Sequence, residues 1–309
     1  MFNDFILAYK GELAALTVAF FWTVSAITFE SAGKKIGSLQ VNIIRLSMAF
    51  VFLSILSWVS RGVVFPFDAT MHNWVWLSIS GLIGFVIGDL MLFQAYVVVG
   101  ARISMLIMAL APAIAALFGW IWLGETITAK QGLAMVFIFL GIALVILRRE
   151  INAPEQHNTR RKVKFSYPIV GLLLAFGGAL GQGGGLVVSK YGMGDYDVFS
   201  AVQIRAIAGI IGFALIFTFS GRWKKLAASL KNRKAMARIS IGAIFGPFLG
   251  VSFSLWAIKF TTTGVASALM SIVPVLIIPF SIYILKEKFK TKEFIGAVIA
   301  ILGVFMFFL

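Results

Sequence analysis

One carboxylate lies deep inside an apolar segment of this 309-residue chain. Asp89 stands between Gly88 and Leu90, well within a run of apolar residues. A carboxyl group at mid-membrane costs about 2.5–3.5 kcal/mol even on a lenient insertion scale, so it needs water, a partner or a proton. A functional Asp89 would line a cavity, bind a substrate amine or carry a coupling proton; a structural Asp89 would be protonated or paired with an arginine. We favour the functional interpretation, because ionisable groups at this depth usually serve a function.

Two arginines are the next candidates for chemistry. Arg45 and Arg205 each lie a few residues inside an apolar segment. Their long side chains could extend to the membrane interface. Alternatively, they could pair with Asp89 or Glu30, or bind an anionic group such as a carboxylate through charge-assisted hydrogen bonds. The sequence leaves these alternatives open.

Amide and aromatic side chains complete the set of candidate binding residues. An amide inside an apolar segment hydrogen-bonds either to a neighbouring helix or to a ligand. An aromatic ring forms a cavity wall or anchors a helix at the membrane interface. From polarity and expected depth, we predict a substrate site made by Asp89, Gln94, Gln182, Gln203 and Trp256, with Arg45, Arg205, Trp22 and Tyr96 as further candidates.

The inventory of catalytic and metal-binding residues is short. The chain has no cysteine, and its two histidines, His72 and His157, are expected in loops, so we predict no metal site and no cofactor. Asp89 lacks the Gly-x-Gly-Asp context of a membrane aspartyl protease, and no phosphate-binding glycine loop is present. We therefore do not expect an enzyme. A channel and a membrane enzyme of unknown chemistry are the alternatives to a carrier.

The composition indicates an α-helical membrane protein. Hydrophobic residues make up 60% of the chain and charged residues only 13%, whereas soluble domains have about 25% charged residues. The apolar residues form runs of about 20, the length of a helix that crosses a bilayer. Because the basic residues gather between these runs, the net charge of +15 points to anionic lipid headgroups rather than nucleic acid.

Ten membrane-spanning helices are expected, in two sets of five. The halves cover residues 1–150 and 167–309, and a polar, basic linker at 151–166 separates them. The expected helices are 5–30, 40–60, 74–99, 102–123 and 128–147 in the first half, and 167–190, 198–219, 238–260, 264–285 and 291–309 in the second.

The two halves repeat one pattern. Pro112 and Pro274 each lie inside a long apolar segment, and each is followed thirteen residues later by a glutamate, Glu125 or Glu287. A proline interrupts helical hydrogen bonding and bends the segment. Since each half has an odd number of helices, the second half must be inverted relative to the first, an architecture that favours a central cavity. The two prolines then mark symmetry-related kinks beside that cavity.

The Lys and Arg distribution predicts an orientation. Numbered in chain order, the odd loops hold 20 of the 27 basic residues and the opposite side holds 5. The positive-inside rule therefore places the odd loops in the cytoplasm and both termini outside. In the seventh loop, Trp223, Leu226 and Leu230 have helical spacing, which indicates either a short interfacial helix or a solvated basic loop.

The chain resembles the ten-helix, EamA-type members of the drug/metabolite transporter superfamily. The motifs that carry the resemblance are Trp22-Thr23-Val24-Ser25, the arginines Arg45 and Arg205, Ala109 to Pro112 with Leu123-Gly124-Glu125 and Gln131-Gly132, and Ser271 to Pro274 with Leu285-Lys286-Glu287. Lys286 stands where the family usually has glycine. The resemblance covers essentially the whole chain.

The resemblance implies a secondary transporter in the cell membrane that exports or exchanges small metabolites, often amino acids or their derivatives. We expect it to work by alternating access, driven by an ion gradient, with protons as one candidate, or by the gradient of the substrate itself. Relatives are usually drawn with both termini in the cytoplasm, which conflicts with the charge distribution. Substrate identity, direction and oligomeric state stay open.

Overall fold

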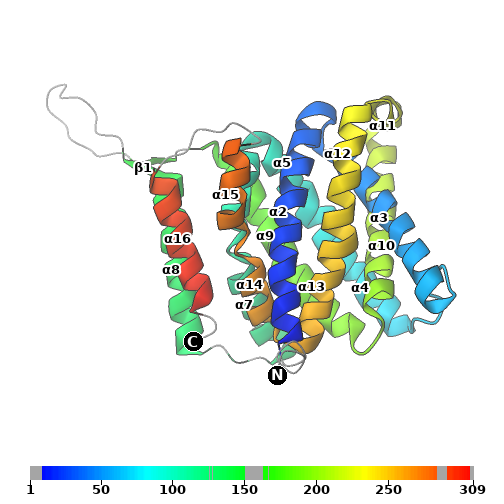
Figure 1. Ribbon diagram of the computed structural model, residues 1–309, viewed down its shortest axis with the longest axis horizontal. Helices are drawn as coiled ribbons and strands as arrows, with labels where there is room; N and C mark the ends of the chain where they lie inside the picture. Colours follow the sequence, from blue (N-terminus) through cyan, green and yellow to red (C-terminus); the bar gives the residue numbers. More distant parts are fainter. Residues whose placement is uncertain are drawn as a thin grey trace, which may run out of the picture.

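The computed structural model describes residues 9–124, 126, 128–149, 163–165, 167–283 and 291–306, and nearly all of them are helical (Figure 1). Seven of the described segments are long and apolar enough to cross a membrane, and 132–144 and 294–303 form shorter apolar helices. The predicted class, an all-α multi-pass membrane protein, is confirmed. Glu125, Glu287 and His157 lie outside the described residues.

The first half contains five spans, two of which are interrupted. These elements are α2 (Lys10–Ile36), α3 (Ser38–Arg61), α4 (Met71–Gly81) with the π-helix η1 (Leu82–Gly88) and α5 (Asp89–Val98), α6 (Gly100–Met108) with α7 (Ala111–Leu123), and α8 (Ala129–Ile146).

The second half repeats this order. Its elements are α9 (Ile169–Met193), α10 (Val198–Ser220), the short α11 (Trp223–Leu230), α12 (Arg233–Ala243) with the π-helix η2 (Ile244–Phe248) and α13 (Leu249–Phe260), α14 (Thr263–Met270) with α15 (Val273–Tyr283), and α16 (Thr291–Phe305). Between the halves, β1 (Leu147–Arg149) pairs antiparallel with β2 (Val163–Phe165), a small strand pair that the sequence did not predict. Of the two alternatives for the segment around Trp223, a short helix or a basic loop, the structure has the helix, α11.

The two halves have opposite orientations and are related by a pseudo-two-fold axis. Followed along the chain in Figure 1, α2 and α9 run in opposite directions, and so does each later pair of equivalent helices. The contacts exchange in the same way: α2 packs on α13 and α12, while its counterpart α9 packs on α5 and α4. Two pairs of equivalent helices, α3 with α10 and α8 with α16, pack on each other across the pseudo-two-fold axis.

The two predicted proline positions coincide with interruptions of the fourth and ninth spans. The chain leaves the helix at Ala109 and Leu110, and Pro112 lies in the first turn of α7. Ser271 and Ile272 form the matching break before Pro274 of α15. A proline is tolerated in a first helical turn because its missing N–H has no intrahelical acceptor there. Each span is therefore two helices rather than one bent helix.

Two boundaries differ from the sequence prediction for local reasons. The third span begins at Met71 rather than 74, because Thr70 caps it: its hydroxyl accepts the N–H of Asn73, and the Asn73 side chain accepts the N–H of Thr70. His72 therefore lies in a helix and not in a loop. The first span extends to Ile36, so Glu30 is inside the helix and fully buried. Its carboxylate accepts the N–H of Ala101 at 2.9 Å.

Glycine allows the two halves to touch through their backbones. Gly84 and Gly88, the last residue of η1, both lie in η1. They face Gly185 and Gly181 of α9, respectively. A Cβ built on Gly181 would lie 2.4 Å from the Cα atom of Gly88, and one on Gly185 would lie 3.1 Å from the Cα atom of Gly84. The helices approach as closely as small-residue faces permit in lipid, so these glycines form a packing surface between the two halves.

Replacing Gly181 with alanine should destabilise the protein. The added methyl group meets rigid backbone, so the helices must separate, and overpacking of this kind costs about 1–3 kcal/mol. The measurement is the unfolding temperature in detergent. The control is Gly132→Ala, where a new Cβ meets nothing within 4 Å and helix propensity gains about 0.5–1 kcal/mol. Equal unfolding temperatures for the two variants would contradict the packing argument.

Candidate functional site

A small cavity lies between the two halves. It has a volume of about 60 Å³ and is lined by α2, α3, η1, α5 and α6 from the first half and by α9, η2 and α13 from the second. That volume holds a few water molecules rather than a metabolite. Ligands of ordinary metabolite size therefore require a more open conformation than the one seen here.

The chemical centre of the cavity is the ion pair between Arg45 and Asp89. The Nη2 atom of Arg45 lies 2.5 Å from the Oδ2 atom of Asp89, and their side chains are only 4% and 13% exposed. Asn42 orients both partners: its Oδ1 accepts the Nε–H of Arg45 at 3.0 Å, and its Nδ2 donates to the Asp89 carbonyl at 3.2 Å. Of the alternatives left open by the sequence, pairing with Asp89 is thus the one observed for Arg45.

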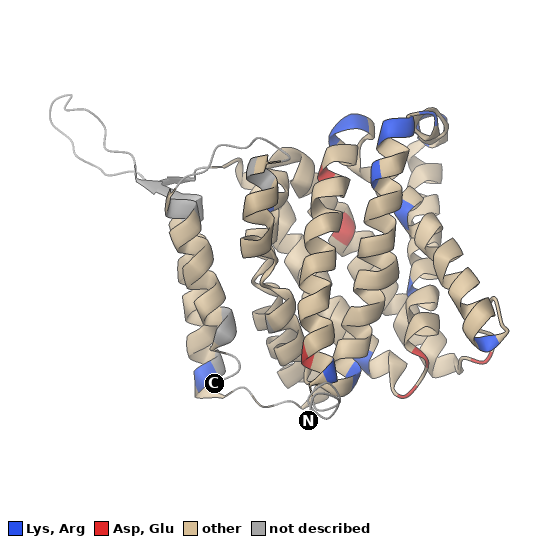
Figure 2. Ribbon diagram, in the orientation of Figure 1, with Lys and Arg blue, Asp and Glu red and all other residues tan. Residues whose placement is uncertain are grey.

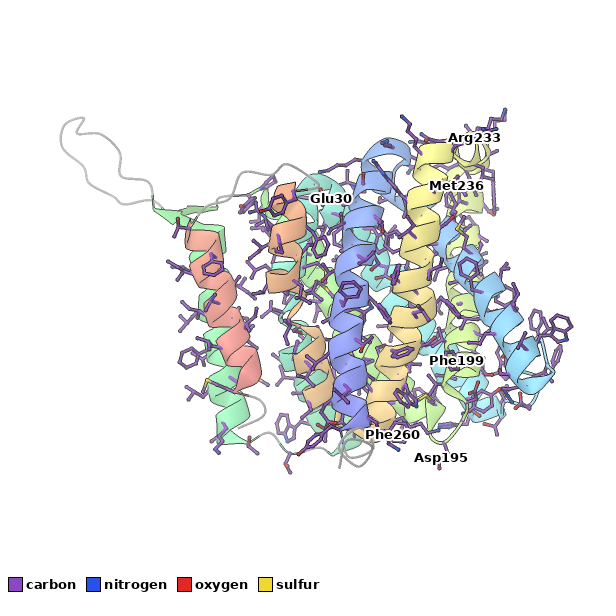
Figure 3. The ribbon with its side chains drawn as sticks, viewed as in Figure 1. Glu30, Asp195, Phe199, Arg233, Met236 and Phe260 are labelled. Carbon is purple, nitrogen blue, oxygen red and sulfur yellow. The ribbon has the colours of Figure 1, made fainter. Side chains whose placement is uncertain are left out.

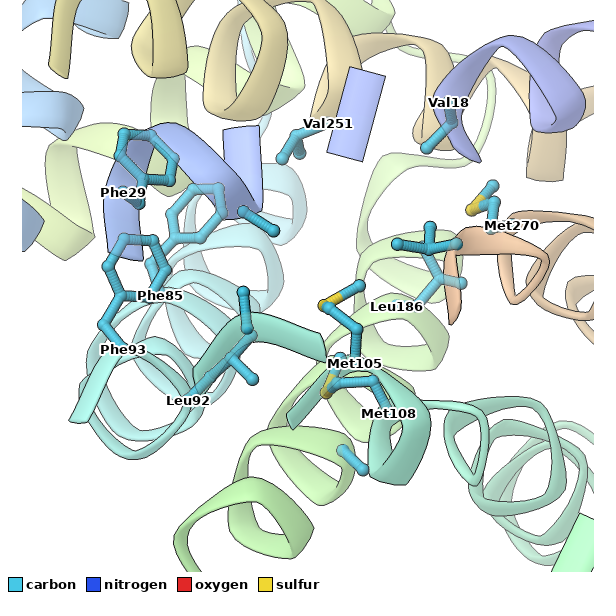
Figure 4. Close-up of a cluster of buried hydrophobic side chains, with 14 of the residues drawn as sticks. Val18, Phe29, Phe85, Leu92, Phe93, Met105, Met108, Leu186, Val251 and Met270 are labelled. Atoms are coloured by element: carbon cyan, nitrogen blue, oxygen red, sulfur yellow. The ribbon is translucent and has the colours of Figure 1, made fainter. Parts of the chain in front are cut away.

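Aromatic rings surround the guanidinium group. The central carbon of the Arg45 guanidinium lies 4.5 Å from the centroid of the Phe93 ring and 5.7 Å from those of Phe29 and Phe85. Figure 4 shows these three rings gathered on one side of the buried cluster, with Met105 and Met108 on another. Ring faces stabilise a cation at these distances, so the cavity combines one ion pair with apolar walls.

A second, smaller compartment adjoins the first. It has a volume of about 20 Å³ and shares Trp22, Met105, Met108 and Gln182 with the larger one. Ser267, Ser271 and Pro274 contribute to its wall. Gln182 therefore borders both compartments.

The structure brings together five of the nine predicted binding residues. Trp22, Arg45, Asp89, Tyr96 and Gln182 all line the larger cavity. The other four lie elsewhere, each for a local reason. The amide oxygen of Gln94 accepts from Ser38 at 2.6 Å, and Gln203 donates to Ser54 and to the Val64 carbonyl. Arg205 packs on Phe85. Trp256 is 38% exposed and packs on Phe253 and Phe260.

Several lining residues were not predicted. Phe29, Phe85, Met105 and Met108 are apolar, so polarity and depth gave no reason to select them. Pro247 had a signal that was missed: it lies inside an apolar segment and, within η2, faces the cavity. Since π-helical turns are rare and occur often at functional sites, the symmetry-related pair η1 and η2 marks the cavity in the fold.

Polar side chains also join the halves at one end of the bundle, the end opposite Glu30 (Figure 3). We call this group the end cluster; its members are Arg61, Asp68, Tyr196, Asp197 and Ser200. Arg61 donates to Asp68 and to the hydroxyl of Ser200, and its Nη1 lies 3.6 Å from the Oδ1 of Asp197. The Tyr196 hydroxyl donates to Asp68 at 2.9 Å. These contacts must break if the halves separate at this end.

Comparison with known proteins identifies the family. A profile of the EamA-like transporter family matches residues 9–147 and 169–309, once in each half. The chain belongs to the EamA-like transporter family. Over 147 residues this EamA-family chain is also 23% identical to an uncharacterized transporter of Haemophilus influenzae, an alignment that covers 48% of this chain and 47% of that protein. The chain thus spans about half the length of that curated relative.

A solved crystal structure shares the fold. It has a TM-score of 0.64, covers 96% of this chain and 97% of its own, and is 16% identical in sequence. At that identity the likeness concerns architecture alone. The family resemblance predicted from the sequence motifs is confirmed, and with it a multi-pass membrane protein of a transporter family.

Removing either partner of the Arg45–Asp89 pair should destabilise the protein. Arg45→Met removes the guanidinium group from the buried carboxylate, and removing one partner of a buried pair costs up to about 3–5 kcal/mol. Asp89→Asn should cost less, because the amide oxygen still accepts from the guanidinium. In the double variant the two losses should not add, with a coupling of at least about 1 kcal/mol. The measurement is the unfolding free energy of all four proteins; additive losses would refute the pair.

The end cluster should make stability depend on pH. Burial alone would raise the pKa of Asp68, but hydrogen bonds from Tyr196 and Arg61 outweigh it and lower the pKa below its usual value. The stabilisation is therefore fully present above the unfolded pKa of about 3.9 and is lost as the pH falls through the lower folded value. Asp68→Asn should flatten the unfolding temperature between about pH 5 and 3.

The matched control for that pH series is Asp195→Asn. Asp195 is exposed at the same end, and its carboxylate makes no hydrogen bond or ion pair with a described residue. Its variant should lose stability in acid as steeply as the unmodified protein does. An Asp68→Asn profile indistinguishable from that of Asp195→Asn would show that the cluster does not stabilise the protein.

Proposed function

We propose that this EamA-family protein is a secondary transporter that moves a small zwitterionic metabolite, such as an amino acid or a derivative, by alternating access. The observation that supports the proposal best is the Arg45–Asp89 ion pair in the wall of a cavity between two inverted halves. The family membership supports transport in general. Export or exchange is the expected direction.

The chemistry of the cavity suits a zwitterion. A substrate carboxylate can replace Asp89 on the Arg45 guanidinium, and a substrate ammonium can take the place of Arg45 on Asp89. Such an exchange leaves no buried charge unpaired, which would otherwise be costly. The rings and methionines around the pair, Phe93 and Met105 among them, offer surface for an apolar substrate side chain.

The architecture suits alternating access. The cavity lies between two halves of opposite orientation, and helices α2 and α9 make equivalent contacts across the pseudo-axis. Rocking one half against the other would open the cavity at one end and close it at the other. The end cluster would then hold one exit closed, since Arg61 joins the two halves there.

The distribution of the basic residues supports an orientation for the proposed transporter. Figure 2 shows Lys and Arg gathered at the end of the bundle where α11 and α12 meet. The positive-inside rule favours this end on the cytoplasmic side of the cell membrane, with both termini outside. The basic α11, with Trp223 and Leu230 exposed, would lie on the anionic headgroups.

Transport without catalysis is the simplest account of the residues present. In the described part of the chain, no group of three or more metal-binding side chains comes together. An ion gradient or the substrate's own gradient would drive the cycle, and Asp89 is the residue placed to carry a proton if protons are the coupling ion.

Counterflow into proteoliposomes tests the proposal. L-Phenylalanine serves as the probe because its side chain matches the aromatic walls. Vesicles loaded with unlabelled probe should accumulate labelled probe in a saturable manner. L-Phenylalanine amide and 3-phenylpropionate should compete at least about tenfold more weakly, since each lacks one charge-assisted contact of about 1.5–3 kcal/mol.

Two further preparations complete the counterflow experiment. Asp89→Asn should lose counterflow, and Arg222→Gln, which removes an exposed charge after α10, should retain it. If the two singly charged analogues competed as strongly as L-phenylalanine itself, zwitterion recognition would be excluded. Non-saturable flux without counterflow would indicate a channel instead.

A further inference from the structure

Arg205 is a buried cation without a counter-ion of its own. It is 4% exposed in α10. Within the described part of the chain, its Nε has no hydrogen-bond acceptor and no carboxylate lies within ion-pair distance of its guanidinium. A buried charge is costly unless it is paired and hydrogen-bonded. The ring of Phe85 is its close electrostatic partner, 4.7 Å from the guanidinium carbon.

The internal repeat explains why Arg205 lacks a partner. Arg45 and Arg205 occupy equivalent places in the second span of each half, α3 and α10. Arg45 finds its carboxylate on the third span, at Asp89. The equivalent position on the eighth span is Val251, which is apolar. At these equivalent positions the repeat therefore provides two arginines but one carboxylate.

The ring of Phe85 lies near both arginines. Phe85 lies 5.7 Å from the guanidinium carbon of Arg45 and 4.7 Å from that of Arg205. Asp89 lies within electrostatic reach of Arg205 as well as in contact with Arg45. The end of the Arg205 side chain also rests against the backbone of η1, since a Cβ on Gly84 would be 3.1 Å from its Nη2.

The backbone before Asp89 forms a π-helical turn rather than a regular α-helix. The Asp89 N–H donates to the carbonyl of Gly84, five residues earlier, which is the wide turn of the π-helix η1. A change in the position of such a turn moves a residue by up to one helical step, about 100° and about 1.5 Å. Gly88 and Gly181 present no side chains to oppose this rotation.

We infer that Asp89 alternates between the two arginines: it pairs with Arg45 in the conformation seen here and with Arg205 when the cavity faces the opposite side. This inference rests on the proposed alternating access. Arg205 is then a positioning residue of the transport cycle. Its role is to keep the Asp89 carboxylate paired while the substrate or the moving halves displace Arg45 from it.

A stability cycle tests the inference without any substrate. Arg205→Met keeps an apolar stem and removes the charge. In the unmodified protein it should leave the unfolding temperature unchanged or raise it, because an unpaired buried cation is lost. In the Arg45→Met background it should lower the unfolding temperature, because Arg205 has become the partner of Asp89. Adding Asp89→Asn to that background should remove the effect.

The sign reversal is what a purely structural Arg205 would not produce. An Arg205→Met effect of equal size and sign in both backgrounds would overturn the inference. If Arg45→Met does not yield folded protein, Arg45→Gln provides the same comparison, because it also removes the cation at position 45. Arg222→Gln is the charge-matched control that should be additive in every background. Failure of the phenylalanine counterflow would reject the proposed substrate and leave this cycle unaffected.

Discussion

The Arg45–Asp89 pair is the interaction around which the membrane domain is arranged. Two charges removed from water gain less from each other than they lose in hydration unless their remaining hydrogen-bonding groups are satisfied. Here Asn42 satisfies the Nε of Arg45, and three phenylalanine rings cover the guanidinium. The pair is therefore tolerated in an apolar bundle. In the proposed transport cycle it is also exchangeable, since a ligand with both charges can satisfy the same groups.

The scaffold around the pair depends on residues that weaken ordinary helices. Glycines let η1 approach α9, prolines follow the breaks in the fourth and ninth spans, and two π-helical turns flank the cavity. Each feature removes side-chain bulk or a backbone hydrogen bond near the centre of the molecule. In lipid the hydrophobic effect does not drive helices together, so their association depends on van der Waals contact. Close packing between small residues therefore stabilises the bundle.

The cavity differs from the surrounding helices in that it departs from the symmetry of the two halves. The inverted repeat provides matching arginines, glycines and prolines, which build the two halves alike. Asp89 has no counterpart because Val251 takes its place, and both residues line the cavity. The cavity is therefore chemically different on its two sides. The ion pair belongs to the first half, while Gln182 and Pro247 come from the second.

The sequence by itself determined the membrane class, the ten spans and the inverted repeat, and it selected Asp89 as the first candidate for a functional group. These follow from composition, from run length and from the offset shared by Pro112 and Pro274, all of which are local or periodic signals. Only the tertiary structure decided which polar residues face the cavity. Gln94, Gln203 and Trp256 have the same types as true lining residues, but they are turned toward Ser38, Ser54 and other aromatic rings. Helix rotation and neighbour choice depend on contacts between segments far apart in the chain, and a polarity pattern does not encode them. For the same reason, only the structure showed that Arg45 is paired with Asp89 while Arg205 is not.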